Sequence, residues 1–319
     1  MAPRRKRVFI LGGGAALGAH HVGAMRYLEE RDVRPDAIVA SSIGIVNACA
    51  YVSGGLPLLE QAWHGFWSFA HIVSPSLKHN PLVGTSLFSM DRLSAAIERF
   101  IDFPKVLTSP LEIEVVTLNL SRGTGEVHST RSCADWQEVR TLSRAGYAIP
   151  LLFPPVRFRG EWYSDGGFAW NIPLERAIAL GATEIYLLAP IASQLPYKKR
   201  FGSFLDFVQR FLDVMWRTIG NMGYLNALMD DGRFHGVPVT VIEPTEQWSG
   251  FGPLAVFNAY PTKNKSLMQA GYRDAKRALR DRDAAAAAQR GRGRGDRTSG
   301  ERRAASGDAI VRPIRPERR

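Results

Sequence analysis

Short apolar runs alternate with longer stretches of helical periodicity over most of the chain. Residues 8–11 and 36–40 are short and mostly apolar, as expected of strands buried on both faces. Residues 19–30 place Val22, Met25 and Leu28 at the spacing of one helical face. The same patterns predict further strands at 112–120, 162–163, 184–189 and 237–242, and helices at 43–52, 58–69, 90–100, 138–148 and 174–180. The alternation of strand, loop and helix predicts an α/β fold with a parallel sheet between helices.

A second amphipathic pattern lies further along the chain, at residues 204–219. Its apolar side chains fall on one helical stripe that comprises Phe204, Phe207, Val208, Phe211, Met215 and Ile219. Such a stripe usually packs into a core, which is the interpretation we favour. A lid or a membrane-docking face is the alternative.

The basic charge of the chain is concentrated at its two ends. The formal net charge is +11 and the isoelectric point is near 9.9. Residues 4–7 are all Arg or Lys, and residues 281–319 hold 11 Arg and 6 acidic residues, so the part between them is nearly balanced. We therefore expect no broad basic face and no specific nucleic-acid partner.

This distribution also divides the chain. We predict a basic N-terminal extension at 1–7, one domain at 8–280, and a disordered tail rich in Arg, Gly and Ala at 281–319. The tail has too few apolar residues to offset the entropy of ordering it. An RNA-binding role for its Gly-Arg repeats is a less favoured alternative.

Cysteine usage and hydropathy bear on the location of the protein. Cys49 and Cys133 form neither a disulfide framework nor a metal-ligand spacing. The apolar run at 8–11 is too short for a signal peptide, and no run of about 18 apolar residues suggests a transmembrane helix. We expect a cytoplasmic protein that makes, at most, peripheral contact with a membrane.

The first candidate for chemistry is the glycine-rich segment 12–18, which follows a predicted strand and precedes a predicted helix. Small residues there let backbone N–H groups approach a negatively charged group. Gly12, Gly14 and Gly18 also resemble a dinucleotide-binding loop, with Asp36 at about the distance of a ribose contact. A tight packing turn is the simplest alternative.

The second candidate is the sequence Ala40-Ser41-Ser42-Ile43-Gly44, between a predicted strand and a predicted helix. It matches the nucleophile elbow G-x-S-x-G, with Ala40 at the first glycine. Such an elbow exposes the hydroxyl of Ser42 beside a helix N-terminus, which favours the oxyanion of acyl transfer. Ser41 is a competing nucleophile one place off the pattern, and a simple N-cap is the structural alternative.

The third candidate is Ser164-Asp165-Gly166-Gly167. An acidic residue followed by two glycines is, by itself, usually only a turn.

Together the three motifs resemble the patatin-like phospholipases, in particular their bacterial branch. Their order and flanks agree as well. The flanking matches are Ser41 to Ala48 with T-S-x-G-x-x-N-A, Ala148 to Pro155 with A-x-P-x-x-F-P-P, and Asn171 to Pro173 with the N-x-P that often follows D-G-G. The resemblance covers roughly residues 8–190. It implies a three-layer α/β/α fold with a mostly parallel central sheet, and hydrolysis of lipid or fatty-acyl esters without a metal or organic cofactor.

The resemblance also assigns roles to residues. It implies Ser42 as nucleophile and Asp165 as its base in a Ser–Asp dyad. The oxyanion hole would consist of main-chain N–H groups around Gly13, Gly14 and Ala15. Small residues that support the motifs are Gly18, Ala40, Gly44, Gly166 and Gly167.

Three departures from the family pattern leave other functions open. Leu17 stands where many members have Lys or Arg, and Ala15 and Ala40 replace glycines. A catalytically weak member with a lipid-binding or scaffold role is therefore an alternative, and a nucleotide-binding oxidoreductase is a less favoured one. A Ser–His–Asp triad that uses His20 or His21 as the base is also open.

Overall fold

The computed structural model describes most of the chain. It describes residues 5–65, 74–75, 84–193, 197–204, 206–208, 210–211, 214, 229, 232–245 and 260–303. The chain divides into two compact units, residues 1–278 and residues 279–319, and each is described by itself. All elements of the candidate site belong to the first unit.

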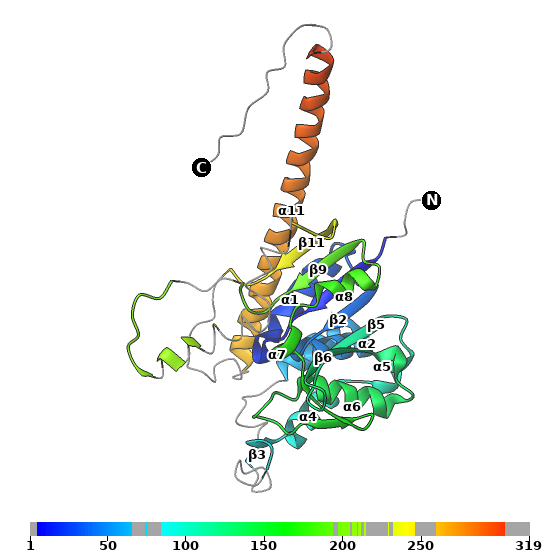
Figure 1. Cartoon of the computed structure of the whole chain (residues 1–319), viewed down its shortest axis with the longest axis vertical. Coiled ribbons are helices and arrows are strands. Elements are labelled where there is room, and N and C mark those ends of the chain that lie inside the picture. Colours follow the sequence, from blue (N-terminus) through cyan, green and yellow to red (C-terminus); the bar gives the residue numbers. More distant parts are fainter. Residues whose placement is uncertain are drawn as a thin grey trace, which may run out of the picture. The chain divides into compact units, whose positions relative to one another are not determined.

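A single mixed sheet forms the centre of the first unit (Figure 1). Its strands are β1 (Arg7–Leu11), β2 (Ala37–Ala40), β5 (Glu112–Asn119), β6 (Thr124–Ser129), β7 (Val156–Phe158), β8 (Glu161–Asp165), β9 (Glu184–Leu188), β10 (Arg233–Phe234) and β11 (Val237–Ile242). The order is β10-β11-β9-β1-β2-β5-β8-β7, and β6 also pairs with β5. The five central strands from β11 to β5 are parallel, whereas β10, β6, β8 and β7 pair antiparallel. The predicted α/β fold with a mostly parallel sheet is confirmed.

Helices cover both faces of this sheet. They are α1 (Ala19–Glu29), α2 (Ile43–His64), α4 (Asp91–Glu98), α5 (Phe103–Thr108), α6 (Trp136–Tyr147), α7 (Gly167–Trp170), α8 (Leu174–Ala179) and α11 (Pro261–Arg303), with 3-10 turns η1 (Ala15–Gly18) and η3 (Thr130–Ser132). Small two-residue strands β3 (Ser74–Pro75) and β4 (Phe88–Ser89) pair outside the main sheet. Val116 of β5 is buried in one core cluster with Leu174 of α8. Its neighbour Val115 points to the other face, where a Cβ on Gly146 of α6 would lie 2.9 Å from it.

Helix α2 is longer than predicted, because it joins the expected helix at 43–52 to the start of the one expected at 58–69. It breaks its helical geometry at Gly55, which has φ 71° and ψ −166°, just before Pro57. By length and composition it is apolar enough to span a membrane, the only such helix among the residues searched. However, half of its most apolar window is buried, and it packs against β1, β2 and β5. It is the core helix of the unit.

The first part of helix α11, up to residue 278, packs against α1 within the first unit. A Cβ on Gly23 of α1 would lie 1.7 Å from the Met268 carbonyl oxygen, and one on Gly271 would lie 2.0 Å from that of His20. These two glycines let the backbones of α1 and α11 touch. The helix extends to Arg303, and the run Ala284 to Ala288 favours it, because alanine has the highest helix propensity. The disorder predicted for 281–319 stays a prediction.

The amphipathic stripe at 204–219 does not form core in its described part. Phe204, Phe207 and Phe211 are exposed, and Val208 is half-buried. Met215 and Ile219 lie outside the described residues. The favoured core interpretation was therefore wrong for these three phenylalanines, because no segment within the described part of the chain covers their side of the helix.

Candidate active site

Ser42 occupies a strained turn between β2 and α2. Its backbone has φ 53° and ψ −126°, a conformation that side chains strongly disfavour. Ser42 is the N-cap residue of α2, yet its side chain makes no capping hydrogen bond. The simple N-cap interpretation is therefore wrong, and the hydroxyl is left for another role at the positive end of the helix dipole.

The competing Ser41 is committed elsewhere. It is fully buried, and its Oγ donates a hydrogen bond to the Trp170 carbonyl oxygen at 3.2 Å. Of the two serines, only Ser42 has the backbone of a nucleophile elbow.

The residues on either side of Ser42 explain why the elbow needs small side chains. A Cβ on Gly44 would lie 2.1 Å from the Leu11 carbonyl oxygen, so no larger residue fits. Ala40 is the last residue of β2, where it is fully buried and pairs with Leu11 and Val115. The fold thus accommodates the methyl group of Ala40 in place of the first glycine of the pattern.

Asp165 is the last residue of β8 and is fully buried. Burial raises its pKa to about 7, because an apolar environment disfavours the charged carboxylate. The nearby Ser42 hydroxyl and the Gly167 N–H, which donates to Oδ1 at 2.8 Å, act in the opposite direction. Oδ2 has no well-formed hydrogen bond with any group in the described structure. This carboxyl is therefore poised to change its charge near neutral pH.

Gly167 shows how close the two predicted dyad residues lie. A Cβ at this position would be 3.1 Å from Asp165 Oδ1 and 3.8 Å from Ser42 Cβ. Gly166 is needed for a different reason, since its Cβ would lie 2.4 Å from the backbone of Val116 in β5. The sheet order thus brings β8 to the site, and the two glycines let its end pack tightly there.

The glycine-rich loop closes the third side of the site. A Cβ on Gly13 would lie 2.9 Å from Ser42 Cβ and 2.8 Å from Asn171 Oδ1, so glycine is required. The Gly13 N–H already donates a hydrogen bond of 2.6 Å to Asn171 Oδ1. In this structure the Gly13 N–H therefore holds the loop against Asn171, and its role in the oxyanion hole stays a prediction.

The other two predicted donors are Gly14 and Ala15. Neither N–H has a hydrogen-bond acceptor among the described residues. A Cβ on Gly14 would lie 2.7 Å from Pro190 Cγ, and Ala15 has a positive φ of 48°. A Cβ on Gly18 would lie 2.6 Å from Ile43, so that glycine lets η1 pack against the start of α2.

Asn171 is a residue that sequence reasoning did not include in the site. It is buried, it follows α7, and its Oδ1 fixes the glycine-rich loop. The available signal was the N-x-P sequence after Asp165-Gly166-Gly167, which was noted only as a family flank.

Replacing Asn171 with alanine is expected to lower both stability and turnover. The variant leaves the buried Gly13 N–H without an acceptor, which destabilises the fold by about 1–3 kcal/mol. It also frees the loop, so kcat should fall about tenfold or more with little change in KM. Asn264→Ala is the control, since Asn264 is equally buried but donates to the Trp63 carbonyl of α2. Thermal unfolding and ester kinetics would check this, and a loss of kcat no larger than in Asn264→Ala would contradict it.

Asn47 supports the end of the same loop from within α2. Its Nδ2 donates to the Gly18 carbonyl oxygen at 2.9 Å, and its Oδ1 accepts from Trp63 Nε1 at 2.8 Å. His21 Nδ1 lies 3.1 Å from Asn47 Nδ2 and accepts from it in the neutral imidazole. Burial and the neighbouring His20 lower the pKa of His21 to about 3. His21 is thus a neutral acceptor within a buried network.

His20, like His21, is not placed to act as a base for Ser42. Its Nε2 lies 3.0 Å from Asp274 Oδ2 of α11, and Asp274 in turn contacts Thr245 and Arg277. Neither histidine has a hydrogen bond to Ser42 in the described structure, so the triad alternative has no geometric support. No group of three or more His, Cys, Asp or Glu among the described residues could hold a metal ion.

The dinucleotide-binding interpretation fails on topology. Asp36 precedes β2, and its carboxylate accepts from the Arg7 N–H at the start of β1. The glycine-rich loop follows the carboxyl end of β1, and β1 and β2 are parallel. Asp36 therefore lies at the amino ends of these two strands, whereas the loop lies at their carboxyl ends. Asp36 cannot contact the ribose of a nucleotide whose phosphates are bound by the loop.

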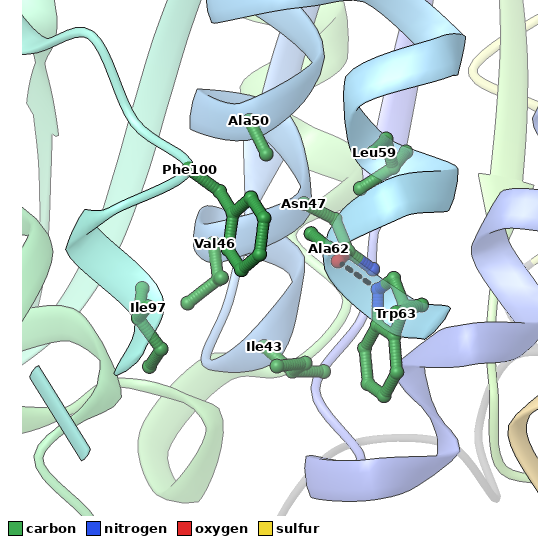
Figure 2. Close-up of a pocket in the computed structure, with 9 residues that line it drawn as sticks. All are labelled: Ile43, Val46, Asn47, Ala50, Leu59, Ala62, Trp63, Ile97 and Phe100. Atoms are coloured by element: carbon green, nitrogen blue, oxygen red, sulfur yellow. Dashed lines mark hydrogen bonds between the residues drawn. The ribbon is translucent and has the colours of Figure 1, made fainter. Parts of the chain in front are cut away.

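A small apolar pocket lies beside α2, and Ile43, the first residue of that helix, forms part of its lining (Figure 2). It lies between the two halves of α2 and the end of α4, and it is lined by Ile43, Val46, Asn47, Ala50, Leu59, Ala62, Trp63, Ile97 and Phe100. The hydrogen bond between Trp63 and Asn47 closes one wall, and Phe100 lies opposite. The apolar lining disfavours a charged group, but in this structure the pocket is too small to hold a whole acyl chain.

Comparison with known proteins agrees with this geometry. The family described as patatin-like phospholipase matches residues 9–178. Patatin-like phospholipase domain-containing protein 6 of Mus musculus is 28% identical over 179 residues, which cover 55% of this chain and 13% of that protein. Lysophospholipase nte1 of Emericella nidulans is 28% identical over 189 residues, covering 56% and 11%. The match therefore spans only a small part of each relative.

Solved structures show a more distant likeness. VipD from Legionella pneumophila is 13% identical with a TM-score of 0.48, covering 88% of this chain and 67% of that one. The sequence relatives named above are animal and fungal, so placement in the bacterial branch stays a prediction. The family match spans more than half of the chain and includes all three motifs that meet around Ser42. On this evidence the chain belongs to the patatin-like phospholipase family.

Proposed function

We propose that the protein is a serine hydrolase of lipid or fatty-acyl esters, with Ser42 as nucleophile and Asp165 as base. The observation that carries this proposal is the meeting of a strained serine with a buried carboxyl whose pKa is about 7. A base is most useful when its pKa lies near the working pH, because it is then both deprotonated and basic. An ordinary surface aspartate, with a pKa near 3.8, would be a weak base for a hydroxyl.

The reaction follows from these groups. Ser42 Oγ attacks the ester carbonyl while its proton passes to the Asp165 carboxylate, and the carbonyl oxygen becomes an oxyanion. The free N–H groups of Gly14 and Ala15, with the N-terminus of α2, stabilise that charge. The alcohol then leaves with the proton from Asp165. Water attacks the acyl-enzyme, again with Asp165 as base, and releases the acid and Ser42.

The substrate class is inferred from the pocket and the family. The apolar side chains around Ile43, the residue after Ser42, would contact the first carbons of an acyl chain whose carbonyl lies at Ser42. The family is that of patatin-like phospholipases, and one relative is named a lysophospholipase. A lipid substrate also fits the proposed location in the cytoplasm with peripheral contact to a membrane.

Two measurements test the proposal together. Hydrolysis of p-nitrophenyl esters of graded chain length should show turnover with an optimum set by the apolar pocket. A fluorophosphonate probe should label one serine, which peptide mass spectrometry should map to Ser42. Ser41→Ala is the matched control and should be labelled like the wild type, whereas Ser42→Ala should not be labelled.

The alternative function predicts a different outcome. A catalytically weak lipid-binding or scaffold protein would bind fatty acids or lysolipids with neither turnover nor labelling. The strained φ of Ala15, at a position that is glycine in many members, is the observation that favours it. A folded protein without turnover on any ester would support that function and overturn the hydrolase proposal.

A further inference from the structure

Four phenylalanines are exposed on one short segment of the first unit. They are Phe201, Phe204, Phe207 and Phe211, and we refer to them as the aromatic patch. Phe204 is 81% exposed, and Tyr197, just before the patch, is 91% exposed. Leaving this many aromatic rings in water is unfavourable, so such a surface usually marks a binding site.

The segment is built to present these rings together. Its described residues between Phe204 and Val214 are helical, and positions 204, 207 and 211 share one helical face. Ser203 caps the start, since its Oγ accepts from the Asp206 N–H at 3.1 Å. The rings touch one another: Phe201 and Phe207 are 5.5 Å apart between centroids, and Phe207 and Phe211 are 6.5 Å apart. The patch is thus an ordered face.

Positive charge surrounds this face. Residues 197–211 contain four basic residues, Lys198, Lys199, Arg200 and Arg210, and one acidic residue, Asp206. Lys198 pairs with Asp206 and lies over the Phe201 ring at 5.6 Å. Lys199 and Arg200 are exposed beside the rings. Aromatic rings flanked by exposed cations are the composition of segments that enter the headgroup region of anionic membranes.

The chain links this face to the candidate active site. Pro190 and Ile191 contact the glycine-rich loop at Gly14. Ser193 is then held by Glu243, which accepts from both its N–H and its hydroxyl. Tyr197 lies six positions after Ile191, which limits the distance between their Cα atoms to about 21 Å. The patch therefore follows, in sequence, a segment that contacts the glycine-rich loop of the candidate site.

We propose that the aromatic patch docks the protein on an anionic lipid bilayer, so that the acyl ester is drawn from that surface. The proposal rests on the proposed function for the identity of the ester, but not for the binding itself. A second copy of the chain is a poorer occupant, because a twofold interface through this face would bring Lys199 and Arg200 of one copy against those of the other.

Vesicle co-sedimentation of the full chain tests the docking. It uses the Ser42→Ala background, so the result does not depend on turnover. The protein with an unchanged aromatic patch should bind vesicles of phosphatidylcholine with phosphatidylserine better than vesicles of phosphatidylcholine alone. Phe204→Ser with Phe207→Ser should reduce binding about tenfold or more, and Lys199→Glu with Arg200→Glu should remove the preference for anionic lipid. Trp162→Ser is the matched control, since Trp162 is also an exposed aromatic residue but lies on β8.

Activity then separates docking from chemistry. With Ser42 intact, the double phenylalanine variant should hydrolyse a soluble short-chain p-nitrophenyl ester like the wild type, yet lose activity on vesicle lipid. Unchanged vesicle binding in that variant would overturn the proposal and assign binding to another part, such as the Arg-rich tail. Absent binding by the wild type, or a dimer that the variant dissociates, would overturn it as well. Failure of the soluble assay alone would count against the hydrolase function and leave the docking result standing.

Discussion

Replacing Ser42 with glycine should abolish ester turnover and at the same time stabilise the protein. The proposed nucleophile is lost, so kcat should fall by roughly 10⁴-fold or more, as it does when serine hydrolases lose their nucleophile. The backbone at φ 53° and ψ −126° is costly for serine but readily adopted by glycine. Relief of this strain should raise the free energy of unfolding by about 1–3 kcal/mol.

Ser42→Ala separates the two effects. Alanine removes the hydroxyl but keeps a Cβ, so this variant should lose activity without the gain in stability. Thermal and urea unfolding of the three proteins, measured beside p-nitrophenyl ester kinetics, would check the prediction. Equal stability of the glycine and alanine variants would show that the elbow is not strained, and residual turnover near the wild-type rate would remove Ser42 from the mechanism.

Replacing Asp165 with asparagine is the second substitution with a large expected effect. Asparagine has the same shape and still accepts from the Gly167 N–H, but it cannot take a proton from Ser42. We expect kcat to fall by about 10³-fold or more, since the serine then lacks its base. The wild-type kcat/KM should rise with pH and level off above about 7, the pKa of the buried carboxyl. A profile that bends near pH 3, or no bend, would point away from Asp165 as base.

The same substitution should make the protein more stable at neutral and higher pH. The pKa of Asp165 is about 7 in the fold and near 3.8 in the unfolded chain, so between these values only the unfolded state loses the proton. The protonated Asp165 carboxyl therefore makes its full contribution to stability below about pH 4, and this contribution is lost as the pH rises to about 7. Asparagine removes that loss, which amounts to a few kcal/mol.

Unfolding of Asp165→Asn and the wild type at pH 4 and pH 8 measures this difference. The advantage of the variant should be larger at pH 8. An advantage that does not change with pH would show that the carboxyl is not buried as described. A less active but more stable variant is the usual sign of a residue kept for function at the expense of the fold.

The amino-acid sequence determined the elements around the site and the residue types within it. Strand, turn and helix were predictable at Ser42 because a sharp elbow excludes large side chains over only a few positions, as Gly44 against Leu11 shows. The motif around Asp165 was recognisable for the same reason, since Gly166 and Gly167 pack against β5 and Ser42. Such steric limits fix the residue types over a few adjacent positions, so a short stretch of sequence is enough to recognise them.

Only the tertiary structure decided which of these groups are free to act. Gly13 is engaged by Asn171, which lies 158 positions away, and His20 by Asp274, which lies 254 positions away. Burial sets the pKa values of Asp165 and His21, and it depends on segments that no local pattern specifies. The stripe at Phe204, Phe207 and Phe211 has the spacing of a core helix, but the fold leaves it exposed. Periodicity defines the apolar side of a helix, whereas long-range packing decides whether anything covers it.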